Sequence, residues 1–156
     1  MKWFVKCIKN YVNFSGRARR AEYWYFVLFS VIFAIAAMIL DKIVFGKPNS
    51  VFYALWGLFI FLPGLAVQVR RLHDTGHSGK MLLWFLIAEI VWMVLLVVTG
   101  LSFLMSAGAG SPSILFLIIA ILGGLGIFVW VIFFLVWYCT AGDKGENKYG
   151  PDPLAE

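Results

Sequence analysis

The chain has 156 residues, which is enough for one domain and little more. Hydrophobic residues make up 62% of it and charged residues only 13%. A soluble domain is about half apolar and about a quarter charged, so this composition excludes an ordinary water-soluble globular protein. The formal net charge is +5. Because the basic residues flank apolar runs, they favour contact with anionic lipid headgroups over nucleic acid.

The first predicted element is an amphipathic helix over residues 2–14. At about 100° per residue its polar residues all fall on one side of the helix, namely Lys2, Lys6, Lys9, Asn10 and Asn13. The apolar residues fall on the other side. Such a helix is expected to lie in the membrane interface, with its apolar side toward the bilayer and its lysines toward headgroups. Packing of the helix against a protein domain is the alternative.

Four apolar runs follow, over residues 24–40, 51–69, 81–99 and 114–139. Each can cross a hydrocarbon core of roughly 30 Å at about 1.5 Å per residue, the first only barely. None shows the alternation that is typical of a membrane β-barrel. The sequence therefore predicts an all-α integral membrane protein with four transmembrane helices. The spans and the interfacial helix form a single membrane domain over residues 1–156, which ends in a polar tail over 141–156.

Lysine and arginine are divided unequally between the two sides of this predicted arrangement. Eleven of the 13 basic residues lie in the N-terminal segment, the second loop and the tail. The other two, Lys42 and Lys47, lie in the first loop. By the positive-inside rule, both termini should be cytoplasmic. Cys7 and Cys139 would then lie on the reducing side of the membrane, where a disulfide is not expected.

Three polar segments lie at the predicted cytoplasmic ends of the spans. They read GRARRAEYW over residues 16–24, RRLHDTGHSG over 70–79 and GENKYGPDP over 145–153. In this order, around four hydrophobic spans, they resemble the DUF805 family of small bacterial inner-membrane proteins, and the resemblance runs essentially end to end. It implies a multi-pass protein of the bacterial inner (cytoplasmic) membrane. It implies no established biochemical activity.

The positions that match the pattern of that family are Gly16, Arg17, Arg20, Glu22, Trp24, Arg70, Arg71, Leu72, His73, Asp74, Ser78, Gly79, Asn147, Tyr149, Gly150, Asp152 and Pro153. One departure is Lys80, which stands where the family usually places a tryptophan after the Ser-Gly pair. A lysine at this position can serve as an interfacial anchor only by extending its ammonium group toward the headgroups.

We expect the three segments to meet as one arginine-rich site. The candidate ligand-binding residues are Arg17, Arg20, Glu22, Arg70, Arg71, His73, Asp74, Asn147, Tyr149 and Asp152. Arg17 and Arg20 are three residues apart and should share a helix face. Asp74 should contact one of the arginines, and the tail should fold over the cluster.

Two interpretations of this cluster remain open. In the first, the arginines anchor the ends of the spans and the carboxylates neutralise them. In the second, they form a pocket for an anionic group, the phosphate of a membrane lipid. Membrane lipids are the predicted partners, nucleic acid is not, and an oligomer is compatible with the sequence.

Glu89 is the one charged residue within the third apolar run. An ionisable group at this depth is costly and by default indicates a function. The alternative function is therefore a small transporter or channel that uses Glu89 to carry protons or to bind a cation. A structural role is also open, in which the carboxyl group bonds to a neighbouring helix through Gln68 or Ser30.

No motif of an enzyme occurs in the chain, whether a phosphate-binding loop, a nucleophile elbow, a metalloprotease helix or a dinucleotide fingerprint. No catalytic residue and no cofactor is predicted. His73, Asp74 and His77 could offer three metal ligands, but Gly76 and Gly79 break any helical spacing, so no metal site is predicted. The sequence favours a structural or binding protein of the membrane.

Overall fold

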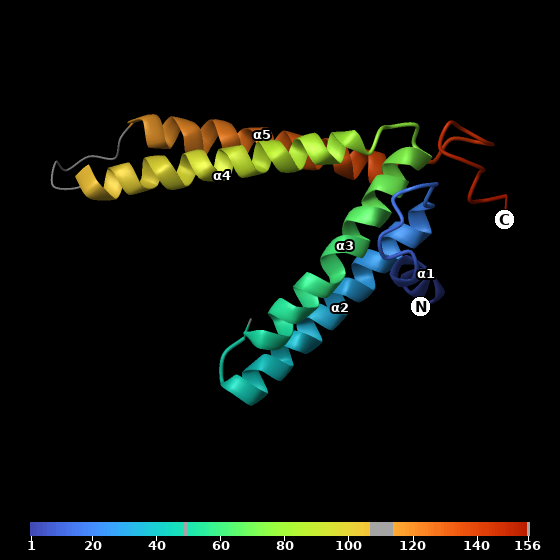
Figure 1. Cartoon of the computed structure of the whole chain (residues 1–156), viewed down its shortest axis with the longest axis horizontal. Coiled ribbons are helices and arrows are strands. Elements are labelled where there is room, and N and C mark those ends of the chain that lie inside the picture. Colours follow the sequence, from blue (N-terminus) through green and yellow to red (C-terminus); the bar gives the residue numbers. More distant parts are fainter. Residues whose placement is uncertain (49, 107–113, 156) are drawn as a thin grey trace. The chain divides into compact units, whose positions relative to one another are not determined.

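The computed structural model describes residues 1–48, 50–106 and 114–155. Five α-helices follow one another in this part of the chain: α1 (Lys2–Lys9), α2 (Arg20–Phe45), α3 (Val51–Asp74), α4 (Lys80–Ser106) and α5 (Ile114–Cys139) (Figure 1). The described residues contain no β-strand, only an isolated bridge between Asn147 and Gly150 in the tail. The predicted all-α class is confirmed.

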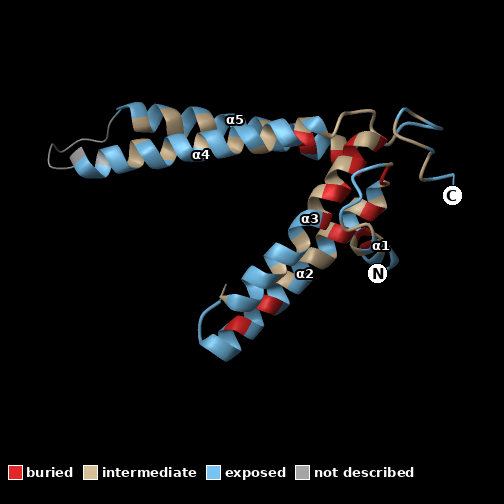
Figure 2. Cartoon of the chain, in the orientation of Figure 1, coloured by how far each residue is buried: buried red, intermediate tan, exposed pale blue. Residues whose placement is uncertain are grey.

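Helices α2 to α5 are each long and apolar enough to cross a membrane, which matches the four predicted spans. Most residues along these helices are exposed or partly exposed (Figure 2), and many of the exposed ones are large and apolar. A bilayer solvates such surfaces, whereas water does not. Helices α2 and α3 extend beyond their apolar runs: α2 begins at Arg20, four residues before its run, and α3 continues to Asp74, five residues after its run. The last turn of α3 is therefore polar and carries most of the RRLHD segment.

The N-terminal helix is shorter than predicted, since α1 ends at Lys9 and not at residue 14. The side-chain amide of Asn10 donates to the carbonyl of Lys6 at 3.0 Å, and such a bond to the backbone competes with helix continuation. Phe4 and Cys7 are buried against the rest of the protein. The ring of Phe4 stacks on that of Phe26, with 5.8 Å between centroids. This part of the apolar side of α1 thus packs on protein.

The chain forms two compact units, Met1–Gly79 with Trp137–Glu156, and Lys80–Val136. In the first unit α2 and α3 lie side by side, and α1 packs against both (Figure 1). Buried residues gather where α1 meets the other two helices (Figure 2). In the second unit, the indole of Trp92 on α4 donates to the carbonyl of Ile119 on α5 at 3.1 Å.

Asp41, near the end of α2, holds the beginning of α3. Its fully buried carboxylate accepts the backbone N–H groups of Ser50, Phe52 and Tyr53 at 2.8, 2.9 and 3.0 Å. These groups lack intrahelical partners because they belong to the N-cap residue Ser50 and to the first turn of α3. An acidic side chain also suits the positive end of the helix dipole. A residue that the sequence analysis passed over therefore joins the two helices.

Replacing Asp41 with alanine should weaken this joint. The loss of a helix cap is expected to lower the apparent Tm of the detergent-solubilised protein by about 2–4 °C. Thermal unfolding followed by circular dichroism measures the change. Lys42→Ala, at the exposed neighbouring position, is the matched control and should leave Tm unchanged. An equal shift in both variants would contradict a capping role for Asp41.

Candidate functional site

The polar end of α3 is shaped by a tight turn. Gly76 has a φ of 73°, a left-handed conformation that favours glycine, and the N–H of His77 reaches back to the carbonyl of Leu72 at 2.9 Å. The segment before α2 crosses this end in an extended form, where the N–H of Ala18 donates to the carbonyl of Arg70 at 3.0 Å. The first two polar segments of the sequence therefore lie against each other.

Arg17 and Arg20 do not share a helix face, contrary to the prediction. Helix α2 begins only at Arg20, and Arg19 before it is extended, with φ −68° and ψ 159°. Gly16, with φ 80°, turns the chain just before Arg17. As a result the side chain of Arg17 is buried inside the protein while Arg20 is exposed.

Asp74 lies between two buried arginines. One carboxylate oxygen accepts Nε of Arg17 at 3.0 Å, and the other accepts Nη1 of Arg71. All three side chains are almost completely shielded from solvent. The predicted contact between Asp74 and the arginines is confirmed. One carboxylate balances only one of the two positive charges, so further acceptors are needed.

Backbone carbonyls supply these acceptors. Arg17 donates to the carbonyl groups of Asp143, Gly145 and Gly150 in the tail. Arg71 donates to carbonyl groups at the end of α5 and just beyond it, those of Trp137, Tyr138 and Thr140. A cation at this end is favoured by the helix dipole and by the carbonyls that lack intrahelical donors. The two arginines thus bind the C-terminal part of the chain to α3.

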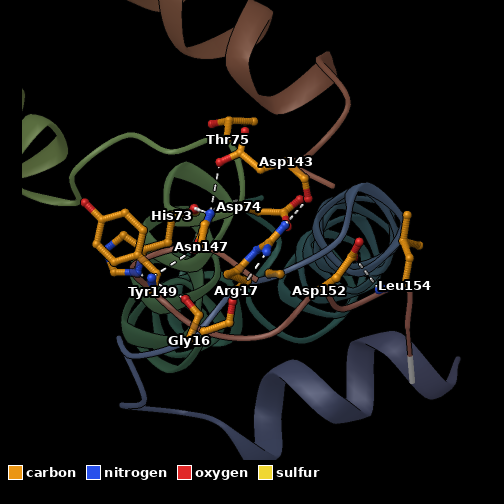
Figure 3. Close-up of polar contacts among 12 residues, drawn as sticks. Gly16, Arg17, His73, Asp74, Thr75, Asp143, Asn147, Tyr149, Asp152 and Leu154 are labelled. Atoms are coloured by element: carbon orange, nitrogen blue, oxygen red, sulfur yellow. Dashed lines mark hydrogen bonds and ion pairs between the residues drawn. The ribbon is translucent and has the colours of Figure 1, made fainter. Parts of the chain in front are cut away.

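The tail itself is folded against the same cluster (Figure 3). Tyr149 stacks on the ring of His73, with centroids 3.9 Å apart and planes inclined by 6°. The amide of Asn147 donates to the carbonyl of His73 at 3.0 Å, and His73 Nδ1 lies 3.1 Å from the carbonyl oxygen of Gly16. All three polar segments therefore meet around the end of α3.

Two further tail residues have local roles. Asp152 accepts the N–H groups of Leu154 and Gly145 at 2.9 and 3.0 Å, and these bonds hold the pKa of its carboxyl below the ordinary value. Gly142 lies so close to the carboxylate of Asp74 that any Cβ would collide with it. The tail can approach the buried ion cluster because this position has no side chain.

A second buried ion cluster forms around Glu22. The completely buried carboxylate accepts Nη1 of Arg70 at 2.6 Å, and Nζ of Lys6 lies 3.4 Å from its other oxygen. The thiol of Cys7 lies 3.7 Å from the same carboxylate. Burial, aided by the negative charge of Glu22, raises the pKa of Cys7 to about 12. The thiol therefore stays protonated at neutral pH and is a poor nucleophile.

Two members of this cluster keep buried polar atoms without a hydrogen bond in the described residues: Oε2 of Glu22, which has only the ion pair with Lys6, and two nitrogens of Arg70. Arg70 is 3% exposed, and its Nε and Nη2 atoms are buried without a hydrogen-bond partner in the described part of the chain. Together with Arg17 and Lys6 it lines a cavity of about 200 Å³. The other residues of that lining are uncharged: Asn10, Asn13, Ser15, Gly16, Pro151 and Pro153. We call this space the Arg70 cavity.

A larger cavity of about 340 Å³ lies beside Arg20. Its charged lining is mixed, with four basic and three acidic residues: Arg19, Arg20, Arg71, Lys144, Asp74, Asp143 and Asp152. The carboxylates there oppose an anion, whereas none of the described carboxylates lines the Arg70 cavity. The Arg70 cavity is therefore the better receptor for a negatively charged group.

Not every sequence prediction falls in these clusters. Among the described residues no group of three His, Cys, Asp or Glu side chains could hold a metal. Glu89 lies in the second unit. Its suggested partners, Ser30 and Gln68, lie in the first unit. There Ser30 donates to the carbonyl of Phe26, and Gln68 donates to the carbonyl of Gly64 and accepts from Tyr138.

The sequence analysis missed the residues that α1 and its following turn bring to Arg70. The sequence predicts Lys6, Asn10 and Asn13 on the headgroup side of an interfacial helix, and it contains no pattern that marks Ser15. The feature of the sequence that could have revealed these partners is Glu22, because an acidic residue that becomes buried needs basic partners. The contribution of Asp143 to the tail, through its bond to Asn147, was also missed.

The chain matches a known protein family over most of its length. The model of the family described as "Protein of unknown function (DUF805)" matches residues 11–151. The chain belongs to the DUF805 family. It is 35% identical to the inner membrane protein YhaH of Escherichia coli (strain K12), covering 100% of this chain and 99% of YhaH. It is 34% identical to the inner membrane protein YhaI of the same organism, covering 98% and 96%.

A third relative, the uncharacterized protein YiiR of Escherichia coli (strain K12), is 29% identical and covers 90% of this chain and 85% of its own length. No solved structure matches the chain. The resemblance inferred from the three polar segments is thus confirmed. This DUF805 member has four apolar helices, and its relatives YhaH and YhaI are named as inner membrane proteins.

The ion cluster at Asp74 should be essential for stability. Asp74→Asn leaves two buried guanidinium groups without a negative partner, which is expected to lower the free energy of unfolding by about 3–5 kcal/mol. Tail release should accompany this loss and appear as faster tryptic cleavage at Lys144 and Lys148. The exposed control Glu146→Gln should change neither property. Unchanged stability and cleavage in Asp74→Asn would refute the role of the cluster.

Proposed function

We propose that this DUF805 member is a binding protein of the inner membrane that holds the phosphate group of an anionic lipid in the Arg70 cavity. The observation that carries the proposal is the state of Arg70, whose buried Nε and Nη2 atoms have no acceptor in the described residues. Leaving buried donors unpaired costs about 1–3 kcal/mol, and a bound ligand can supply the missing acceptors.

The chemistry of the cavity suits a phosphate. Its oxygens accept several hydrogen bonds at once, and arginine offers a planar fork of N–H groups that matches them. Lys6, whose side chain is 37% exposed, can contribute a further positive charge. Asn10, Asn13 and Ser15 can bond to the ester and glycerol oxygens of a headgroup. Among the described lining residues there is no carboxylate to repel the ligand.

The second part of the proposal concerns orientation. Eleven of the 13 basic residues belong to the N-terminal segment, the second loop and the tail, which supports a cytoplasmic location for both termini. The Arg70 cavity would then open toward the leaflet that carries negative surface potential. The exposed residues Lys2 and Lys9 of α1 would face the headgroups of this leaflet, as an interfacial helix requires.

Reporter fusions test the orientation. Alkaline phosphatase is active only outside the cytoplasm, so a fusion after Glu156 should be inactive. A fusion between Ser106 and Ile114, a segment that lies outside the described residues, should be active. Because the two sites lie on opposite sides of the predicted membrane, the reverse pattern would invert the topology.

Lipid binding tests the site. The purified full chain should bind phosphatidylglycerol in native mass spectrometry, and diacylglycerol, which has the same chains but no phosphate, should bind much less. Arg70→Lys keeps the charge opposite Glu22 but loses the fork of donors, so the affinity for phosphatidylglycerol should fall about tenfold. Excess inorganic phosphate should compete if the phosphate group is the part that is recognised.

Arg20→Lys is the matched control, because Arg20 is exposed and lines the other cavity. Its affinity for phosphatidylglycerol should equal that of the parent protein. Circular dichroism and Tm establish that both variants are folded. Equal lipid affinity in Arg70→Lys and the parent protein would contradict the proposal, as would equal binding of diacylglycerol.

A further inference from the structure

We propose that the second unit, Lys80–Val136, binds an organic ammonium ion in a cavity between α4 and α5. This cavity has a volume of about 180 Å³. Its lining includes one carboxylate, Glu89, and three aromatic residues, Phe85, Trp92 and Trp130. The site lies entirely within one unit and is independent of the Arg70 cavity.

Glu89 lies among apolar and aromatic residues. It lies nine residues after Lys80, the first residue of α4, in a helix that carries no other charged residue beyond Lys80. It is half-buried, and none of the described residues forms a hydrogen bond or ion pair with it. No basic residue lines the cavity. A carboxylate in such apolar surroundings is costly unless a cation accompanies it.

The fold fixes an aromatic wall beside this carboxylate. The indole of Trp92 donates to the carbonyl of Ile119 at 3.1 Å, which sets the orientation of the ring. The same indole lies against Gly123, where any Cβ would overlap with it, so glycine at this position makes room for the ring. Trp130 stacks on Phe134, with centroids 5.7 Å apart. Two large aromatic side chains are thus held in place at the cavity.

This combination selects the kind of cation. Aromatic faces attract ammonium groups, and quaternary ammonium ions are recognised by clusters of such rings. A calcium or magnesium ion needs about six or more oxygen ligands, and among the described lining residues Glu89 supplies the one carboxylate. A proton relay needs further titratable groups, and the lining contains none. An ammonium ion with apolar substituents satisfies both the carboxylate and the rings.

Phenyltrimethylammonium is a suitable probe for the detergent-solubilised full chain. Its neutral isostere tert-butylbenzene has the same shape with carbon in place of nitrogen and serves as the control for hydrophobic partitioning. Equilibrium dialysis with the radiolabelled cation should show saturable binding. Excess unlabelled cation should displace it, and excess tert-butylbenzene should not.

Variants then assign the site. Glu89→Gln keeps the shape of the side chain but removes its charge, and it should weaken the binding of the cation about tenfold or more. Trp92→Leu and Trp130→Leu should each weaken the binding several-fold, which corresponds to the loss of one desolvated cation–π contact. Trp84→Leu is the matched control, because Trp84 is 65% exposed on the same helix and does not line the cavity. It should bind like the parent protein.

Three results would overturn the proposal. They are no saturable binding by the parent protein, equal affinity in Glu89→Gln, and displacement of the cation by tert-butylbenzene. Should Glu89→Gln fail to fold, judged by circular dichroism and gel filtration, the comparison of Trp130→Leu with Trp84→Leu decides. Equal losses in these two variants would then count against the cavity.

Discussion

Asp74 presents one carboxylate oxygen to Arg17 and the other to Arg71, and both arginines also donate to backbone carbonyls from the C-terminal part of the chain. Arg71 donates in addition to the carbonyl of Ala18. The positive charge that the carboxylate leaves uncompensated is spread over these carbonyl dipoles. The conformation of the tail follows from this requirement. Gly142 allows the backbone to approach Asp74 closely, and Gly145, with φ 75°, turns a carbonyl toward Arg17.

The adjacent residues Arg70 and Arg71 separate the two interpretations that the sequence left open. Arg71 is bonded on every side by Asp74 and by carbonyl groups, so it behaves as a structural anchor. Arg70 pairs with Glu22 and keeps two buried donor nitrogens that find no acceptor among the described residues. Anchoring therefore explains Arg71 and Arg17, whereas the proposed ligand concerns Arg70. Because neighbouring helical residues project about 100° apart, one dipeptide can serve both roles.

The sequence predicted the all-α class and the family, and both are confirmed. It also predicted four spans, and four of the described helices are long and apolar enough to cross a membrane. The errors lie at helix ends. Helix α1 stops at Lys9 because Asn10 bonds back to the backbone, and α2 starts at Arg20, too late to include Arg17. Such boundaries depend on local hydrogen bonds that the hydrophobic pattern does not report. Asp41 is not evident from the sequence for a similar reason, since its carboxylate accepts N–H groups at the start of a different helix, α3.

The sequence by itself determined that the chain needs a bilayer. The hydropathy of a run of about 20 residues is a sum over neighbouring positions, so it can be evaluated without knowing the rest of the fold. The three polar segments could be recognised in the same local way. Only the tertiary structure decided that Asp74 pairs with Arg17 and Glu22 with Arg70, over separations of 57 and 48 residues. The energy of a charge pair depends on the distance and burial of both partners. Those quantities exist only once segments that are distant in sequence have packed together.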